Sequence, residues 1–274
     1  MRKILSVFAA VMVMCAMLAS CGAAPETQTQ LKITPVDRLT TILHAGGELE
    51  GKKLLNCQEA FYRYYDMGFR YFEYDLKLSS DGRLIGTHSW EHLSDGYDGM
   101  SYEAFCALRL EGGYTPVNED WLVEMLEQYP DVTVIVDAKM DTALEDAAVI
   151  KRLDRLQTIH DIDLSQRILS EVFSIEMWQA LDGQVTFEHF LFSRYKEYYD
   201  VGTVVDNFPV GKFIGVALPY DYLDDYYKRN IAYFQEQGYR VFMFGINGAE
   251  DVTGAAAIGA DTVYIDGEYM LPPV

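Results

Sequence analysis

The sequence contains few basic residues. Lysine and arginine number 22 against 42 aspartates and glutamates, which gives a net charge of −20 at pH 7. A surface this acidic repels the phosphate backbone of nucleic acids at long range, so we expect no nucleic-acid partner. An anionic substrate would be repelled in the same way and would need a local positive centre, such as a bound metal ion.

Long apolar runs are also scarce, and one of them stands at the start of the chain. The basic MRK precedes ILSVFAAVMVMCAMLAS, which is the layout of a signal peptide. This run ends in Leu-Ala-Ser-Cys and resembles the cleavage box of bacterial lipoproteins, in which the cysteine, here Cys21, is lipidated. We therefore expect residues 1–20 to be removed. An uncleaved transmembrane anchor and a plain secretion signal are the alternatives.

The next segment is small, polar and proline-containing, without an apolar period. It fits a tether over residues 21–38 that joins a lipid anchor at Cys21 to one domain at 39–274. The mature protein would then lie outside the cytoplasm, attached to a bacterial cell membrane. Removal of Arg2 and Lys3 makes it more acidic still.

Cysteine is too scarce for a disulfide-rich scaffold, since the chain has four. Cys15 lies in the signal segment and Cys21 is the lipidation site, which leaves Cys57 and Cys106. An exported protein permits a disulfide between them. Spacing alone does not show that the two side chains meet, so the sequence leaves their pairing open.

Apolar runs rich in β-branched and aromatic residues recur along the domain, separated by segments with helical spacing. Near-continuous apolar strands that alternate with helices indicate parallel strands covered by helices. At this length the pattern favours an α/β fold of the (β/α)8 TIM-barrel type over an open doubly wound sheet. The predicted strands are 40–45, 70–76, 83–88, 132–138, 167–173, 189–194, 213–218, 240–246 and 261–266.

Nine strands are one too many for an eight-stranded barrel. Only KLSSDG separates the second predicted strand from the third, which is too short for a parallel crossover and contains the Asp-Gly hairpin signal. We therefore predict a β-hairpin after the second strand, with its second arm outside the barrel. If Asp81 and Gly82 form a two-residue turn, His88 faces Asp75.

Two predicted strands end in closely spaced polar residues. Glu73 and Asp75 are two positions apart and so point to the same side of their strand, and Asp137 and Lys139 repeat that spacing. Carboxylates at the C-terminal ends of barrel strands are suitable oxygen ligands for a hard divalent cation. Solvated acids on an exposed strand face, and a structural ion pair between Asp137 and Lys139, are the alternatives.

Two histidines also stand at strand ends. His44 ends the first predicted strand, before Ala-Gly-Gly, where the backbone can approach a ligand closely, and His88 ends the hairpin arm. A neutral histidine can accept a proton and a protonated one can donate it. Two histidines beside a metal-held phosphodiester would supply both roles.

The motifs together resemble the glycerophosphodiester phosphodiesterase family, which shares its barrel and two-histidine chemistry with phosphatidylinositol-specific phospholipase C. The resemblance extends to VFMFGIN and GADTVYID near the C-terminus and so covers most of residues 39–274. The motifs that carry it are H-A-G-G from His44, N-x-x-E-A-F from Asn56, F-E-Y-D-x-x-x-x-x-D-G-x-L-I-x-x-H ending at His88, and V-D-A-K ending at Lys139.

This resemblance implies metal-dependent hydrolysis of a phosphodiester. It implies a general acid–base pair, three carboxylate ligands of calcium or magnesium, a phosphate contact and a residue lining the substrate pocket. The acid–base pair would be His44 and His88, and the metal ligands would be Glu73, Asp75 and Asp137. Lys139 would contact the phosphate, and Asn56 would line the substrate pocket.

The chain departs from the family pattern at several positions. Ala45 stands where the family has a phosphate-binding arginine, and Asp137 where glutamate is more common. These features indicate a variant branch with H-A-G-G and D-x-K, in which we expect Lys139 or Arg194 to contact the phosphate instead. Deacylated phospholipids, phosphoinositides and phosphodiester-linked polymers all remain candidate substrates. A non-catalytic lipoprotein that binds a phosphorylated ligand is the alternative function; a glycoside hydrolase would leave the two histidines unexplained.

Overall fold

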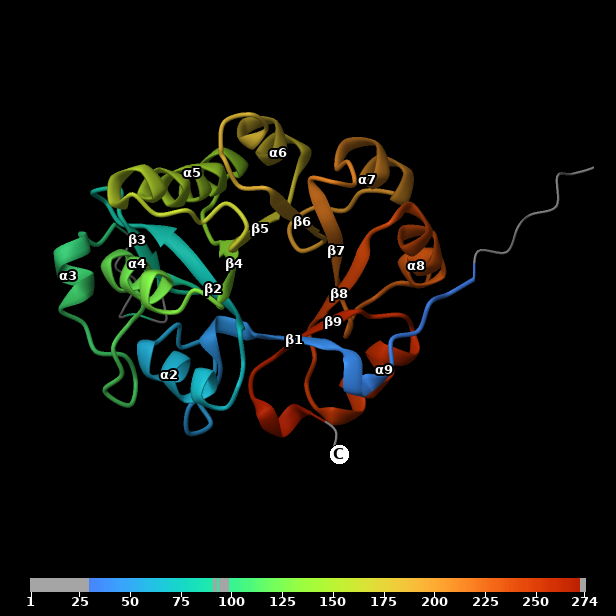
Figure 1. The fold of residues 1–274 in the computed structure, drawn as a ribbon, viewed down its shortest axis with the longest axis horizontal. Coiled ribbons are helices and arrows are strands. Elements are labelled where there is room, and N and C mark those ends of the chain that lie inside the picture. The colour runs from blue at the N-terminus through green and yellow to red at the C-terminus, as the bar shows by residue number, and fades with distance from the viewer. Residues whose placement is uncertain (1–29, 91–92, 94–98, 272–274) are drawn as a thin grey trace, which may run out of the picture. The chain divides into compact units, whose positions relative to one another are not determined.

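The computed structural model describes residues 30–90, 93 and 99–271, and it contains a closed barrel of parallel strands (Figure 1). The strands follow one another around the barrel, and β1 pairs with both β2 and β9, which closes the ring. The predicted TIM barrel is therefore confirmed over an open sheet. The staves are β1 (Thr40–Leu43), β2 (Tyr71–Leu78), β4 (Thr133–Ala138), β5 (Ile168–Val172), β6 (His189–Ser193), β7 (Phe213–Pro219), β8 (Arg240–Phe244) and β9 (Thr262–Ile265).

Helices surround the strands (Figure 1). The expected signal segment and Cys21 lie outside the described residues, and among those that are described no helix is long and apolar enough to cross a membrane. The α-helices are α2 (Gln58–Asp66), α3 (Tyr102–Cys106), α4 (Glu119–Gln128), α5 (Ala143–His160), α6 (Ile175–Leu181), α7 (Val201–Asn207), α8 (Asp225–Gln237) and α9 (Ala249–Ala257). Short 3-10 turns are η1 (Val36–Arg38), η2 (His44–Gly46) and η4 (Glu268–Met270).

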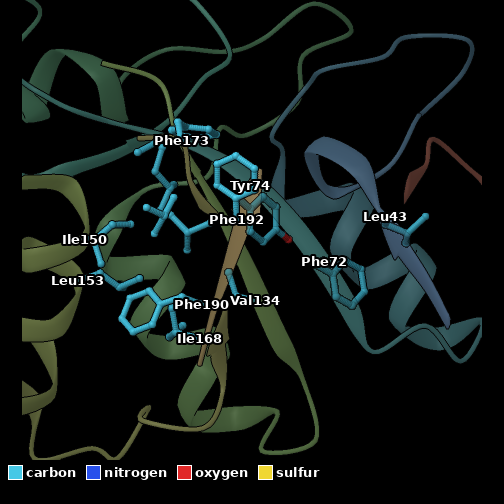
Figure 2. Close-up of a cluster of buried hydrophobic side chains, with 14 of the residues drawn as sticks. Leu43, Phe72, Tyr74, Val134, Ile150, Leu153, Ile168, Phe173, Phe190 and Phe192 are labelled. Atoms are coloured by element: carbon cyan, nitrogen blue, oxygen red, sulfur yellow. The ribbon is translucent and has the colours of Figure 1, made fainter. Parts of the chain in front are cut away.

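Helix α5 illustrates why these segments fold as they do. Its N-terminus is a capping box, in which Thr142 accepts from the backbone N–H of Glu145 while the Glu145 side chain accepts from that of Thr142. Its apolar residues recur at helical spacing and are buried. Figure 2 shows Ile150 and Leu153 of this helix in one layer with the strand residues Val134, Ile168 and Phe190.

A second, smaller apolar cluster fills the inside of the barrel. Seven of the barrel strands contribute one buried side chain each, so this part of the barrel interior is a packed core and not a pore. The members are Ile42, Ile135, Leu169, Leu191, Ala217, Phe242 and Tyr264.

The predicted hairpin is present, but its register differs from the prediction. Strand β3 (Leu84–Gly86) pairs antiparallel with β2 and lies outside the ring, as expected. The pairing places Leu78 opposite Leu84, so that Thr87, and not His88, follows in register with Asp75. The turn has a three-residue loop ending in Gly82, whose φ of +78° is left-handed, and this extra residue shifts the register by one. Cys57 and Cys106 are both free thiols.

Candidate active site

Polar residues form a layer inside the barrel, between the seven-residue apolar cluster and the C-terminal ends of the strands. Side chains alternate along a strand, so the residue two positions after a member of this apolar cluster also points into the barrel. On four strands this step leads from an apolar to a polar side chain, towards the C-terminal mouth where barrel active sites lie. The pairs are Ile42 and His44, Ile135 and Asp137, Leu169 and Glu171, and Leu191 and Ser193.

Three carboxylates converge at the ends of β2 and β4. Asp75 and Asp137 are register partners on these adjacent parallel strands, and Glu73 precedes Asp75 on the same face. One oxygen from each lies within 4.8 Å of the others. Burial and the charges of Asp75 and Asp137 raise the pKa of Glu73 well above its usual value. The sequence therefore identified a set of acidic residues that the fold does bring together.

The donor set fits a hard divalent cation. All the candidate ligands are carboxylate oxygens, which calcium and magnesium prefer. Glu73 Oε1 and Asp137 Oδ1 are buried and have no hydrogen-bond partner among the described residues. Buried carboxylate oxygens without partners are costly, and coordination of a cation would satisfy them.

Lys139 supplies positive charge to the same cluster. Its Nζ lies 2.5 Å from Asp137 Oδ2 and 3.2 Å from Asp75 Oδ1, so the ion pair considered from the sequence is present. Burial would lower the pKa of Lys139, but Asp137 and Asp75 raise it well above its usual value. Burial likewise opposes ionisation of Asp75, but Lys139 and the two histidines lower the pKa of that carboxyl. Lys139 thus stays charged at the centre of the site.

Asn56 contacts this cluster on the side away from the cavity. The residue is fully buried and is not among the residues that line the cavity. Its Nδ2 donates to Asp75 Oδ2 at 2.8 Å, and its Oδ1 accepts from the backbone N–H of Asp75 at 2.9 Å. This two-way contact fixes the position of the Asp75 carboxylate. Asn56 therefore lies behind the cluster, and not in the pocket lining as the resemblance implied.

The H-A-G-G segment turns sharply after β1. Ala45 has a left-handed φ of +48°, and its N–H donates to Glu73 Oε2 at 2.7 Å. A Cβ at Gly46 would lie 2.8 Å from the ring of Tyr74, and one at Gly47 would lie 2.4 Å from the ring of Tyr64. The glycines therefore permit close packing against two tyrosines, whereas the sequence suggested close approach to a ligand.

The His44 side chain is held by Asp266, which was not among the site residues expected from the sequence. Its Nδ1 lies 3.0 Å from Asp266 Oδ1, just beyond β9, and Lys53 Nζ lies 2.7 Å from Asp266 Oδ2. Burial opposes protonation of His44, but the hydrogen bond to Asp266 and the charges of Asp75 and Asp266 outweigh it and raise the pKa. Burial also opposes ionisation of Asp266, but His44 and Lys53 lower its pKa. The sequence did contain one indication of this role, because Asp266 is an acidic residue at the end of the last predicted strand, 261–266.

A cavity of about 360 Å3 lies at the barrel mouth. Both His44 and His88 line it, with Glu73, Asp137, Lys139 and Lys53. Thus the two histidines do share a site, although the hairpin register that suggested it was wrong.

Two further charged residues lie in β5 and directly after β6. Glu171 lines the cavity and accepts from the Tyr264 hydroxyl at 2.7 Å; burial and the charge of Asp137 raise the pKa of this carboxyl to about 7. Arg194, an expected phosphate contact, is not among the lining residues. Its guanidinium instead pairs with Asp224 at 2.6 Å and lies over the rings of Tyr198 and Tyr227.

Comparison with solved structures identifies the fold. A candidate glycerophosphodiester phosphodiesterase from Galdieria sulphuraria superimposes with a TM-score of 0.70 at 19% identity, covering 87% of this chain and 97% of that one. A glycerophosphodiester phosphodiesterase from Parabacteroides distasonis gives 0.66 at 16% identity, covering 84% and 93%. An Oleispira antarctica phosphodiesterase in complex with the product sn-glycerol-3-phosphate gives 0.65 at 18%, covering 83% and 92%.

These likenesses place the chain among (β/α)8 barrels. Within that class, its fold is the fold of glycerophosphodiester phosphodiesterases. No protein-family profile and no curated protein sequence matches the chain.

Proposed function

We propose that the protein is a metal-dependent phosphodiesterase that hydrolyses glycerophosphodiester-like substrates with His44 and His88 as acid and base. The observation that carries the proposal is the single cavity shared by both histidines, two of the three clustered carboxylates and Lys139. The shared fold adds weight, since one neighbour binds sn-glycerol-3-phosphate.

Glu73, Asp75 and Asp137 would hold calcium or magnesium, which would stabilise negative charge on the phosphoryl oxygens. His44 is oriented by Asp266 at Nδ1, which leaves Nε2 to exchange a proton with the substrate or water. His88 exchanges the second proton, so that one histidine activates the nucleophile while the other protonates the leaving alcohol. Lys139 contributes positive charge beside the phosphate.

Lys53 takes over the phosphate contact that Ala45 cannot make. Among the residues lining the cavity, the lysines are Lys53 and Lys139, and the second is already engaged by two carboxylates. The Lys53 side chain is 47% exposed and pairs with Asp266 beside His44. It is therefore placed to meet an anionic oxygen of a bound substrate.

Phosphorus NMR tests the reaction class directly. Purified protein would be incubated with glycerophosphodiesters, phosphatidylinositol and a teichoic-acid fragment, with calcium, with magnesium and with chelator. We expect turnover only with a divalent cation, and a loss of about 100-fold or more in kcat for His88→Ala. His160→Ala, at the exposed end of α5, is the matched control. Turnover that survives the chelator, or that His88→Ala leaves unchanged, would overturn the proposal.

A non-catalytic lipoprotein that binds a phosphorylated ligand would give a different result. Such a protein would bind sn-glycerol-3-phosphate in a calorimeter but turn over none of the diesters. Cleavage restricted to phosphatidylinositol would instead indicate phospholipase C-like activity.

The membrane location is a separate proposal that rests on the N-terminal sequence. Residues 18–21 match a lipoprotein cleavage box, so we propose that Cys21 carries a lipid and anchors the barrel outside the cytoplasm. Metabolic labelling with a radioactive fatty acid would test it in cells that express the full chain. Label should be incorporated by the wild-type protein and lost in Cys21→Ser; equal labelling would contradict the anchor.

A further inference from the structure

Three consecutive backbone carbonyls at the end of β4 accept hydrogen bonds from lysine side chains. Nζ of Lys196, which follows β6, donates to the Ala138 carbonyl at 3.2 Å and to the Met140 carbonyl at 3.1 Å. Between them, the Lys139 carbonyl accepts from Nζ of Lys77 on β2. Two lysines from elsewhere in the barrel thus hold the backbone of the active-site lysine.

This part of β4 needs such donors because it has lost one neighbouring strand. The pairing with β2 continues to Ala138, whereas the pairing with β5 ends at Val136. A carbonyl that is shielded from water and has no hydrogen bond is costly, and a lysine ammonium carries three donors. Residues 137–140 therefore depend on side chains, in addition to β2, for their position.

Lys196 is held in turn by a buried carboxylate. Its Nζ lies 2.7 Å from Asp146 Oδ2, and the Asp146 side chain, on helix α5, is 1% exposed. Oδ1 of Asp146 accepts from the backbone N–H of Met140 at 3.0 Å. Lys196 and Asp146 therefore contact both polar groups of the Met140 backbone, and they fix it relative to α5 and to the loop after β6.

We propose that Lys196 and Asp146 are positioning residues for Asp137 and Lys139 in the active site. This inference rests on the proposed phosphodiesterase function. Asp137 directly precedes the three carbonyls, and Lys139 lies between the two that Lys196 contacts. Neither Lys196 nor Asp146 is among the residues that line the cavity, so both act through the backbone and not on the substrate.

Amide hydrogen exchange tests this role without metal or substrate. In chelator-treated protein, Lys196→Met should speed exchange of the Lys139 and Met140 amides by about tenfold relative to the wild type, because the segment opens more often. The amides of residues 134–136, which lie between β2 and β5, are the internal reference and should change less. An equal acceleration at both ends of β4, or none at either, would overturn the inference.

Kinetics and calorimetry measure the consequence for the site. We expect Lys196→Met to lower kcat by about 10–100-fold with a smaller change in KM, and to weaken the binding of calcium or magnesium in the same range. Lys196→Arg keeps the positive charge and several donors, so it should recover most of both losses. An unchanged kcat and an unchanged metal affinity in Lys196→Met would overturn the inference.

Arg167→Met is the matched control. The Arg167 guanidinium also donates to three backbone carbonyls, but these lie before the start of β4, at the end of the strand away from the site. Its replacement should lower the melting temperature and leave kcat and metal affinity unchanged. Lys151→Met, at an exposed position on α5, controls for the lost charge. Similar losses of kcat in Lys196→Met and Arg167→Met would overturn the inference and show that the Lys196 contacts serve only the fold.

The inference and the proposed function fail in different ways. A wild type that binds no metal and turns over no diester would overturn the phosphodiesterase, while faster exchange confined to Lys139 and Met140 in Lys196→Met would still support the positioning role. Turnover by the wild type, with exchange and kcat unchanged in Lys196→Met, would overturn the positioning role and leave the phosphodiesterase intact.

Discussion

His44 Nδ1 and Asp266 Oδ1 lie 3.0 Å apart although 222 residues separate them in the chain. The contact forms because β9 closes the barrel against β1, with Ile265 and Leu43 in register. A carboxylate in this position selects the tautomer with the proton on Nδ1 and favours the charged imidazolium. Asp266 is therefore a positioning residue for His44.

Replacing Asp266 by asparagine tests this role. We expect Asp266→Asn to lower kcat by about 100-fold with a smaller change in KM, because the neutral amide no longer fixes the tautomer. The pKa of His44 should also fall, because the hydrogen bond and charge of Asp266 raise it. NMR titration of the imidazole in chelator-treated protein measures that shift. An unchanged His44 pKa would show that Asp266 serves only to hold the fold.

Asn56 gives a prediction about the carboxylate cluster. Asn56→Ala removes both contacts with Asp75, and a buried group left without a partner costs about 1–3 kcal/mol. We expect a lower melting temperature and weaker stabilisation by added calcium or magnesium. Thermal unfolding at a series of metal concentrations measures both. Asn230→Ala provides the comparison, because the Asn230 side chain donates to the Tyr226 carbonyl within α8. Equal metal responses in the two variants would contradict the role of Asn56.

The sequence was sufficient to predict the barrel because that inference depends on local patterns. Each barrel strand is a short apolar run, and six of the eight described α-helices have a side-chain N-cap, so neither requires knowledge of distant contacts. The cluster of three carboxylates was also predictable, since Glu73 and Asp75 share a strand and Asp137 lies near the end of the neighbouring barrel strand.

Other features depend on geometry that the sequence does not contain. Gly82 takes the last place in a three-residue loop, and a single extra loop residue shifts every pair in the hairpin. The contact between Asp266 and His44 exists only after the barrel closes. Arg194 matched the charge that phosphate needs, but its guanidinium pairs with Asp224 instead.

Glu119 makes stability depend on pH far from the active site. Its side chain is 2% exposed, accepts from Arg83 and Arg152, and also accepts from the Leu84 N–H. Burial opposes ionisation, but Arg152, the Leu84 N–H and Arg83 outweigh it and lower the pKa of Glu119. A carboxyl with a lowered folded-state pKa stabilises the fold above its unfolded pKa, and this contribution is lost as pH falls through the folded pKa.

We therefore expect Glu119→Gln to destabilise the protein by about 3 kcal/mol near neutral pH, because it removes the buried charge that pairs with Arg152 and Arg83 and leaves Arg83 with Asp120 alone. The difference from wild type should shrink as the pH falls below the ordinary range of glutamate. Urea unfolding between about pH 7 and pH 3 measures this. Glu127→Gln, at an exposed position on α4, the helix that also carries Glu119, controls for the loss of one charge. A difference that stays constant with pH would show that the carboxyl contributes shape and not charge.

Two neighbouring lysines provide the sharpest test of substrate binding. Lys53 lines the cavity and pairs with Asp266 at 2.7 Å, whereas Lys52 points to Glu111 at 3.9 Å and does not line the cavity. If Lys53 contacts the phosphate in the ground state and the transition state alike, Lys53→Ala should raise KM by about tenfold with little change in kcat. Lys52→Ala removes the same charge one residue away and should leave both constants unchanged. Steady-state kinetics on a diester at two salt concentrations distinguishes a local contact from a general field effect, because screening weakens only the latter strongly. Equal effects of the two substitutions would show that net charge, and not the position of Lys53, governs binding.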